Sequence, residues 1–91
     1  MKLILLAIAP PTTFGNTKPG ELWLNGHSSM PTPEHRGLKV GDELGERSSY
    51  GRAYETTEPG KYRIFGCGAQ DPLASDYRVY PVLVAKVNEV E

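Results

Sequence analysis

The chain has 91 residues, a net charge of −1 from ten basic and eleven acidic residues, and one cysteine, Cys67. This length allows one small domain that buries roughly 60–65% of its unfolded surface, and the balanced charge argues against nucleic-acid binding by general electrostatics. A lone cysteine excludes an internal disulfide and fits a reducing compartment, so we expect a cytoplasmic protein.

The first apolar segment, Leu3–Ile8, predicts a β-strand with apolar side chains on both faces, in the interior of a sheet. Pro10 and Pro11 end it, because proline cannot donate to a β-ladder. The segment also has the composition of a short signal peptide, but Pro10 directly after Ala9 disfavours cleavage. It is too short to span a bilayer, and we expect no membrane association.

Loop dominates the next part of the chain. Turn-forming residues fill Thr12–Gly20, and a short strand follows at Glu21–Leu24. Asn25-Gly26 is expected to close this strand, because the dipeptide favours positive φ and a tight turn. An irregular, proline-containing segment, His27–Gly37, follows.

Short strands and turns are expected to alternate in the second half. Leu38–Leu44 has two interpretations: a short strand with a turn at Gly41-Asp42, or a connector that folds back over a sheet edge. Arg52–Thr57 predicts another strand, which Pro59-Gly60 ends. Lys61–Phe65 is compatible with one turn of helix or with a further strand, and loop follows it.

The longest strand is expected within Ser75–Glu91. Tyr77–Val84 is an aromatic and β-branched run, typical of a strand that is buried on both faces. An aspartate at Val82 or Leu83 is therefore expected to abolish folding. Pro81 lacks a ladder donor, which predicts a sheet edge or a β-bulge.

These segments predict a mainly β fold, with five or six short strands and at most one short helix. Ten glycines and eight prolines support many turns and little helix. The longest loops are too short to link two cores, so residues 1–91 are expected to form a single compact β-rich domain.

No metal site is predicted. The soft ligands His27, His35 and Cys67 lack the spacing of known metal-binding pairs. Cys67 lies between two glycines, which would allow a ligand to approach the thiol, but a lone cysteine is more often a small buried hydrophobe.

Tyrosines and arginines alternate in the second half of the chain and are the most informative side chains for function. Both types are enriched at binding hot spots, and both stack on bases or nucleotides, although tyrosines also serve as core packing. From them we predict a small non-catalytic binding module, an inhibitor or accessory protein without a cofactor. It would dock on a protein partner through a surface formed by Arg47, Tyr50, Arg52, Tyr62 and Arg63.

Three segments between Glu21 and the end of the chain follow one another in a recognisable order. Leu38–Leu44 has the pattern Leu-x-x-Gly-Asp-x-Leu, Tyr54–Thr57 has the pattern Tyr-x-Thr, and Tyr80–Val82 leads into an acidic stretch that ends at Glu91. This order and spacing resemble the small ADP-ribosyltransferases of the rifamycin-modifying type.

The resemblance implies an alternative function, an NAD-dependent mono-ADP-ribosyltransferase with an NAD cleft between two small sheets. In that family a histidine contacts the NAD ribose, a tyrosine the nicotinamide ring, and an acidic residue the second ribose. Tyr54 matches the tyrosine and Glu89 or Glu91 the acid. His27 matches the histidine if the turn shifts by two residues, since Asn25 otherwise occupies that position. In the binding-module interpretation, the protein would have a reduced ADP-ribosyltransferase-like fold without the catalytic activity.

Overall fold

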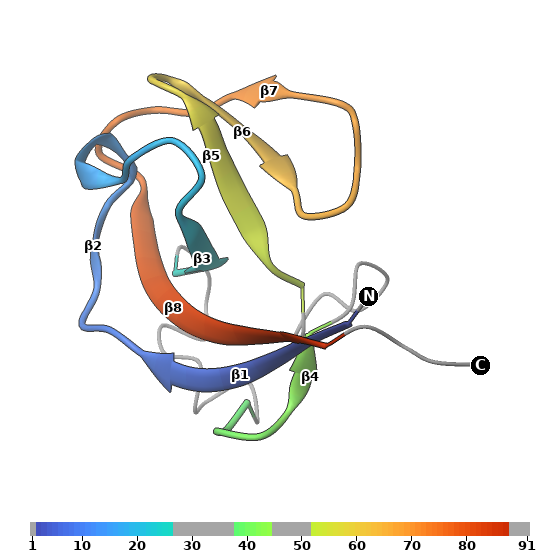
Figure 1. Ribbon diagram of the computed structural model, residues 1–91. Coiled ribbons are helices and arrows are strands. Elements are labelled where there is room, and N and C mark those ends of the chain that lie inside the picture. The colour runs from blue at the N-terminus through green and yellow to red at the C-terminus, as the bar shows by residue number, and fades with distance from the viewer. Residues whose placement is uncertain (1, 27–37, 45–51, 88–91) are drawn as a thin grey trace.

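The computed structural model describes residues 2–26, 38–44 and 52–87, which form one curled antiparallel sheet (Figure 1). The strands are β1 (Lys2–Ile8), β2 (Thr12–Thr13), β3 (Leu22–Asn25), β4 (Glu43–Leu44), β5 (Tyr54–Glu58), β6 (Lys61–Ile64), β7 (Asp71–Pro72) and β8 (Arg78–Val87). One three-residue 3-10 helix, η1 (Phe14–Asn16), is the only helical element in these ranges. The predicted mainly β fold is confirmed: five strands have four or more residues, and β2, β4 and β7 have two each.

β8 organises the sheet, whose strand order is β4-β1-β8-β3-β5-β6-β7. Its first residues pair with β2 and β3, and its second half pairs with β1 from Val82 to Val87. The strand bends strongly between these two halves, as the orange-to-red ribbon in Figure 1 shows. This bend curls the sheet, so that its two faces cover two separate apolar clusters.

Pro81 lies at the point where β8 changes its partner strand. On one side it pairs with Trp23 of β3, and on the other its carbonyl accepts a hydrogen bond of 2.8 Å from the Ala9 amide, one residue beyond β1. The nitrogen and the carbonyl of a strand residue point to the same side. The missing N–H therefore faces the gap between β1 and β2, where the ladder needs no donor. Of the two predicted settings, the sheet edge is wrong, because β8 is an interior strand. The register shift in the β1–β8 ladder lies between Leu5 and Ala7 of β1 and not at Pro81.

The apolar segments at the two ends of the chain form strands, as predicted. At the start of β8, Val79 and Tyr80 are buried on opposite faces, whereas β1 and the second half of β8 are covered on one face only. In β1, Leu3 and Leu5 are buried while Leu6 is 44% exposed. In β8, Val82 packs against the core, whereas Leu83 is 63% exposed. The expectation that aspartate at Leu83 abolishes folding is therefore wrong, because that charge would remain in water.

Asn25-Gly26 does not form the predicted tight turn. Asn25 is the last residue of β3 and pairs with Val79, and the Gly26 amide donates to the Arg78 carbonyl at 3.2 Å. Gly26 is not among the glycines with positive φ. A Cβ at this position would lie 3.0 Å from Arg78 Cγ and 3.1 Å from Tyr80 Cε1. The glycine is needed for close approach to β8 and not for a turn.

The two open alternatives of the second half are resolved. Leu38–Leu44 combines both interpretations: a turn in which Gly41 has a φ of +97° precedes β4, which pairs with β1 at the sheet edge. Lys61–Ile64 is a strand and not a helical turn, because Pro59 and Gly60 reverse the chain and pair β6 with β5. The loop expected after β6 contains the two-residue strand β7.

Alternation along the strands separates two apolar clusters on opposite faces of the sheet. The larger cluster contains leucines from β1, β3 and β4 together with Ala53 and Tyr80. The smaller one, the aromatic cluster, is centred on Phe14, Trp23 and Val79, with three tyrosines and Leu73 packed around them. The chain thus buries β3 on both faces and places aromatic rings on the side away from the larger core.

Candidate functional site

Strand register brings the aromatic rings together. Trp23 of β3 is directly opposite Tyr54 of β5, and Tyr62 of β6 is opposite Thr56, two residues further along β5. Because paired residues share a face of the sheet, all four side chains point to the same side. Tyr77, just before β8, joins them from the other side of Trp23.

The rings pack in contact with one another. Trp23 and Tyr54 are stacked with centroids 5.0 Å apart and an interplanar angle of 16°, and Tyr62 lies 5.7 Å from Trp23 and 5.8 Å from Tyr54. Phe14 meets Trp23 edge-on at 5.8 Å. Aromatic pairs in such arrangements contribute about 0.5–1.5 kcal/mol each beyond their buried area. The rings therefore form a rigid base and not a mobile surface.

A series of three linked hydrogen bonds fixes the indole ring of Trp23. The Trp23 Nε1–H donates to Thr56 Oγ1 at 3.1 Å, and the Thr17 hydroxyl donates to the Phe14 carbonyl at 2.6 Å. The two threonine hydroxyls are 2.6 Å apart. The Thr17 hydroxyl has one proton and donates it to Phe14, so Thr56 must donate to Thr17. Each donor in this series of three hydrogen bonds therefore has an acceptor. This fixes the orientation of Trp23.

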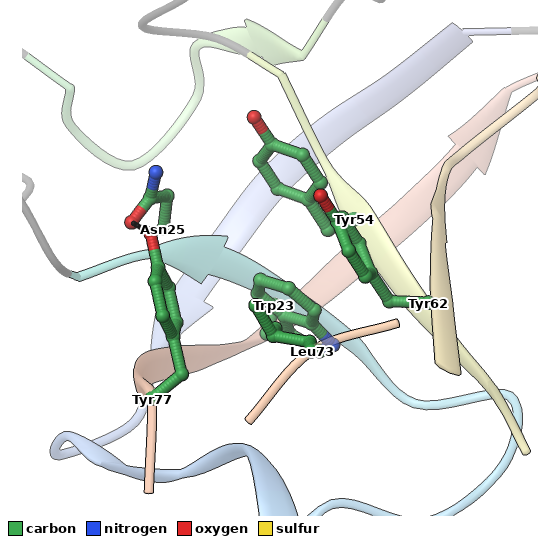
Figure 2. Close-up of a pocket in the computed structure, with 6 residues that line it drawn as sticks. All are labelled: Trp23, Asn25, Tyr54, Tyr62, Leu73 and Tyr77. Carbon is green, nitrogen blue, oxygen red and sulfur yellow. Dashed lines mark hydrogen bonds between the residues drawn. The ribbon is translucent and has the colours of Figure 1, made fainter. Parts of the chain in front are cut away.

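Above this base lies a pocket of about 50 Å³, lined by Trp23, Asn25, Tyr54, Tyr62, Leu73 and Tyr77. Figure 2 shows Trp23 and Leu73 at its base, the hydroxyl-bearing rings of Tyr54 and Tyr62 on one side, and Tyr77 with Asn25 on the other. The Tyr77 hydroxyl donates to Asn25 Oδ1 at 2.7 Å, which holds that wall in place. The Tyr54 and Tyr62 hydroxyls have no hydrogen-bond partner among the described residues.

Burial and one nearby carboxylate affect the titration of a pocket tyrosine. Burial raises the pKa of the Tyr62 hydroxyl, and the neighbouring Asp71 carboxylate raises it further, so the phenol stays protonated at neutral pH. Asp71 is opposite Tyr62 in the β6–β7 ladder and forms no ion pair with any described residue. The other carboxylates on these strands are compensated: Glu55 binds Arg63 at 2.7 Å, and Glu58 lies 3.7 Å from Lys61.

The site residues expected from sequence separate into three groups. Tyr54 and Tyr62 line the pocket. Arg52 and Arg63 do not line it, and Arg63 is bound to Glu55. The remaining expected residues lie outside the described ranges: His27, Arg47, Tyr50 and Glu89.

Sequence reasoning missed Trp23, Asn25, Leu73 and Tyr77, which complete the pocket. A signal existed for two of them: Trp23 and Asn25 are two residues apart in a strand, on the face opposite Leu22 and Leu24. Leu73 lies in a loop with no periodic pattern, and nothing local indicates that it approaches a tryptophan fifty residues earlier in the chain.

No group of three or more potential metal ligands occurs in the described part of the chain. Within the same ranges, no helix is long and apolar enough to cross a membrane. The chain matches no protein-family model, and neither a curated protein nor a solved structure is significantly similar to it. The pocket is therefore interpreted from its own chemistry.

Proposed function

We propose that this protein is a small non-catalytic binding module, an inhibitor or accessory protein, which docks on a protein partner through the aromatic pocket. The observation that carries the proposal is a pre-formed aromatic recess whose Tyr54 and Tyr62 hydroxyls have no partner within the described chain. Such a recess offers large contact area and orienting hydrogen bonds at little entropic cost, because its rings are already packed. We propose the cytoplasm as its setting, since the single cysteine cannot form a disulfide within the chain.

The dimensions of the recess support a side-chain anchor in preference to a whole cofactor. Small-molecule sites typically enclose roughly 300–1,000 Å³, whereas the recess encloses about 50 Å³. This space accepts the end of one side chain. Of the three residues that the transferase resemblance would use, Tyr54 alone lies in the described part of the chain, where it is stacked on Trp23.

Site-directed photocrosslinking tests the proposal. A photoreactive benzoylphenylalanine replaces Leu73, which lines the pocket, and in a matched control it replaces Leu83, which is 63% exposed and lies elsewhere on the sheet. In lysate of the source cells, we expect a defined adduct from position 73 that excess unmodified protein competes away. Equal labelling from both positions, or no competed adduct, would reject docking through the pocket.

Calorimetry with NAD separates this proposal from the transferase alternative. We expect no saturable heat at millimolar NAD and no rise in melting temperature. A ligand at a hundred times its dissociation constant would add about 2.7 kcal/mol to the free energy of unfolding, which a thermal melt detects easily. A saturable isotherm that His27→Ala abolishes, with the fold intact, would establish the alternative.

A further inference from the structure

We propose that the aromatic pocket receives the ammonium group of a lysine side chain on the protein partner, held between the tyrosine rings and beside Asp71. The inference rests on the proposed docking function and names the chemistry of its anchor. Three independent properties of the pocket carry it: its size, its unused acceptors and its charge.

The size fits a primary ammonium. The pocket leaves about 50 Å³ for the centre of a water-sized sphere, and one water molecule, which is close in size to an ammonium group, needs about 10–15 Å³ by the same measure. A guanidinium plane or a trimethylammonium group needs considerably more room than an ammonium group. Trp23 and Leu73 both line the pocket and give it an apolar base, which suits the methylene groups of a lysine side chain.

The walls supply acceptors and ring electrons. An ammonium group has three N–H donors, and the Tyr54 and Tyr62 hydroxyls each have acceptor lone pairs that no described residue uses. Tyrosine rings also attract cations within about 6 Å of the ring centroid. The sheet already shows one such contact, in which Lys86 Nζ lies 5.8 Å from the Phe65 centroid. An apolar occupant would leave both hydroxyls without a partner and desolvated.

The charge favours a cation. Among the described residues, no basic side chain lines the pocket, and the Glu55–Arg63 and Glu58–Lys61 ion pairs of β5 and β6 are each neutral overall. Asp71, opposite Tyr62 in the ladder, forms no ion pair with any described residue. A lysine ammonium would balance this carboxylate, whereas an anionic or neutral anchor would not.

Amide-detected NMR titration with n-butylammonium tests the chemistry without the partner. We expect saturable shifts centred on Trp23, Tyr62 and Leu73, and weaker or no shifts with n-butanol, a neutral molecule of similar length. Asp71→Asn should weaken butylammonium binding by about two- to fivefold, as expected for an exposed charge pair. The control Glu43→Gln removes the same charge at the opposite edge of the sheet and should leave binding unchanged.

Several results would overturn the inference. Equal shifts with butanol would mean an apolar anchor, and tighter binding of butyltrimethylammonium would mean a methylated lysine. If no amide shifts occur at the pocket at 100 mM butylammonium, or if Asp71→Asn and Glu43→Gln lower the affinity equally, a cationic anchor is rejected. Photocrosslinking distinguishes this failure from failure of the proposed function. An adduct from position 73 without butylammonium binding would reject a lysine anchor but keep docking through the pocket. Butylammonium binding without a competed adduct would reject docking on a protein partner.

Discussion

Thr56 is a single buried polar residue on which the geometry of the pocket depends. It is 2% exposed, accepts the Trp23 indole N–H and donates to Thr17. It therefore links β5 to β3 and to the turn after η1 through one hydroxyl. A buried polar group of this kind stabilises only while every partner is satisfied.

Replacing this hydroxyl with a methyl group should be costly. Thr56→Val keeps the shape but leaves the Trp23 N–H buried without an acceptor, so we expect the free energy of unfolding to fall by about 1–3 kcal/mol. Urea denaturation followed by tryptophan fluorescence measures it. Thr57→Val is the matched control, because that hydroxyl forms an exposed bond to Gln70. A Thr56→Val loss no larger than the control would mean that the hydrogen-bond chain does not hold the indole.

Tyr62 predicts an alkaline limit to stability. Its pKa lies above the usual value of 10.0, chiefly because of burial and then because of Asp71. The unfolded chain therefore loses this proton first, and the stabilisation present below pH 10 declines as the pH rises through the folded-state pKa. We expect Tyr62→Phe to lose less stability than wild type between pH 9 and 11 in urea titrations. Parallel curves would contradict this assignment.

Two of the six pocket residues were candidates from the sequence. Tyr62 was one because tyrosine is a common anchor at binding surfaces, and Tyr54 was one through the transferase resemblance. Arginine is equally common at binding surfaces, yet Arg63 is bound to Glu55 on the neighbouring strand. Such a cross-strand ion pair cannot be inferred before the strand register is known. Leu73 belongs to the site because of β6–β7 pairing, which two residues cannot signal in a sequence.

Among the elements, the strands with strong apolar or β-branched patterns were predictable and the short ones were not. β1, β3 and β5 agree with expectation within two residues, and β8 lies within the expected segment Ser75–Glu91, whereas β2 and β7 have only two residues each. Asn25-Gly26 was misinterpreted because continued pairing with β8 outweighs the turn preference of the dipeptide. Leu83 was misinterpreted because composition cannot show that one face of a sheet lacks a covering layer.

Gly26 tests the contact between β3 and β8. Gly26→Ala places a methyl group 3.1 Å from the ring of Tyr80, which is 5% exposed and cannot move freely. We expect a loss of about 1–3 kcal/mol in the free energy of unfolding, as for other overpacked sites. Gly68→Ala is the control, since nothing lies within 4 Å of its Cβ position. Equal stability of the two variants in thermal melts would mean that β3 and β8 tolerate a wider spacing.

At the scale of the whole molecule, the outer face of β1 and β8 exposes several apolar side chains. Leu6, Leu83 and Val87 are 44%, 63% and 41% exposed. Beside them lies a wide, shallow hollow lined by apolar residues from Ala7–Ala9 and Pro81–Leu83. Contiguous apolar surface of this kind lowers solubility in a small domain.

A charge on this face should improve solution behaviour without loss of fold. We expect Leu83→Lys to change the free energy of unfolding by less than about 0.5 kcal/mol, and to raise the solubility limit measured by ammonium sulfate precipitation. Val79→Lys, at a fully buried position of the same strand, should fail to fold. If Leu83→Lys also unfolds, the face is covered in solution.

The central place of β8 has a consequence for synthesis. During translation β1 leaves the ribosome well before β8, with which it pairs over most of its length, since Lys2 pairs with Val87, some eighty residues later. β3 likewise waits for residues 79–81. Such a high contact order slows folding, because a long loop must close before the β1–β8 and β3–β8 ladders form. Until β8 emerges, both apolar clusters lack the strand against which they pack. The nascent chain then exposes unpaired strand edges, to which a holdase chaperone would bind.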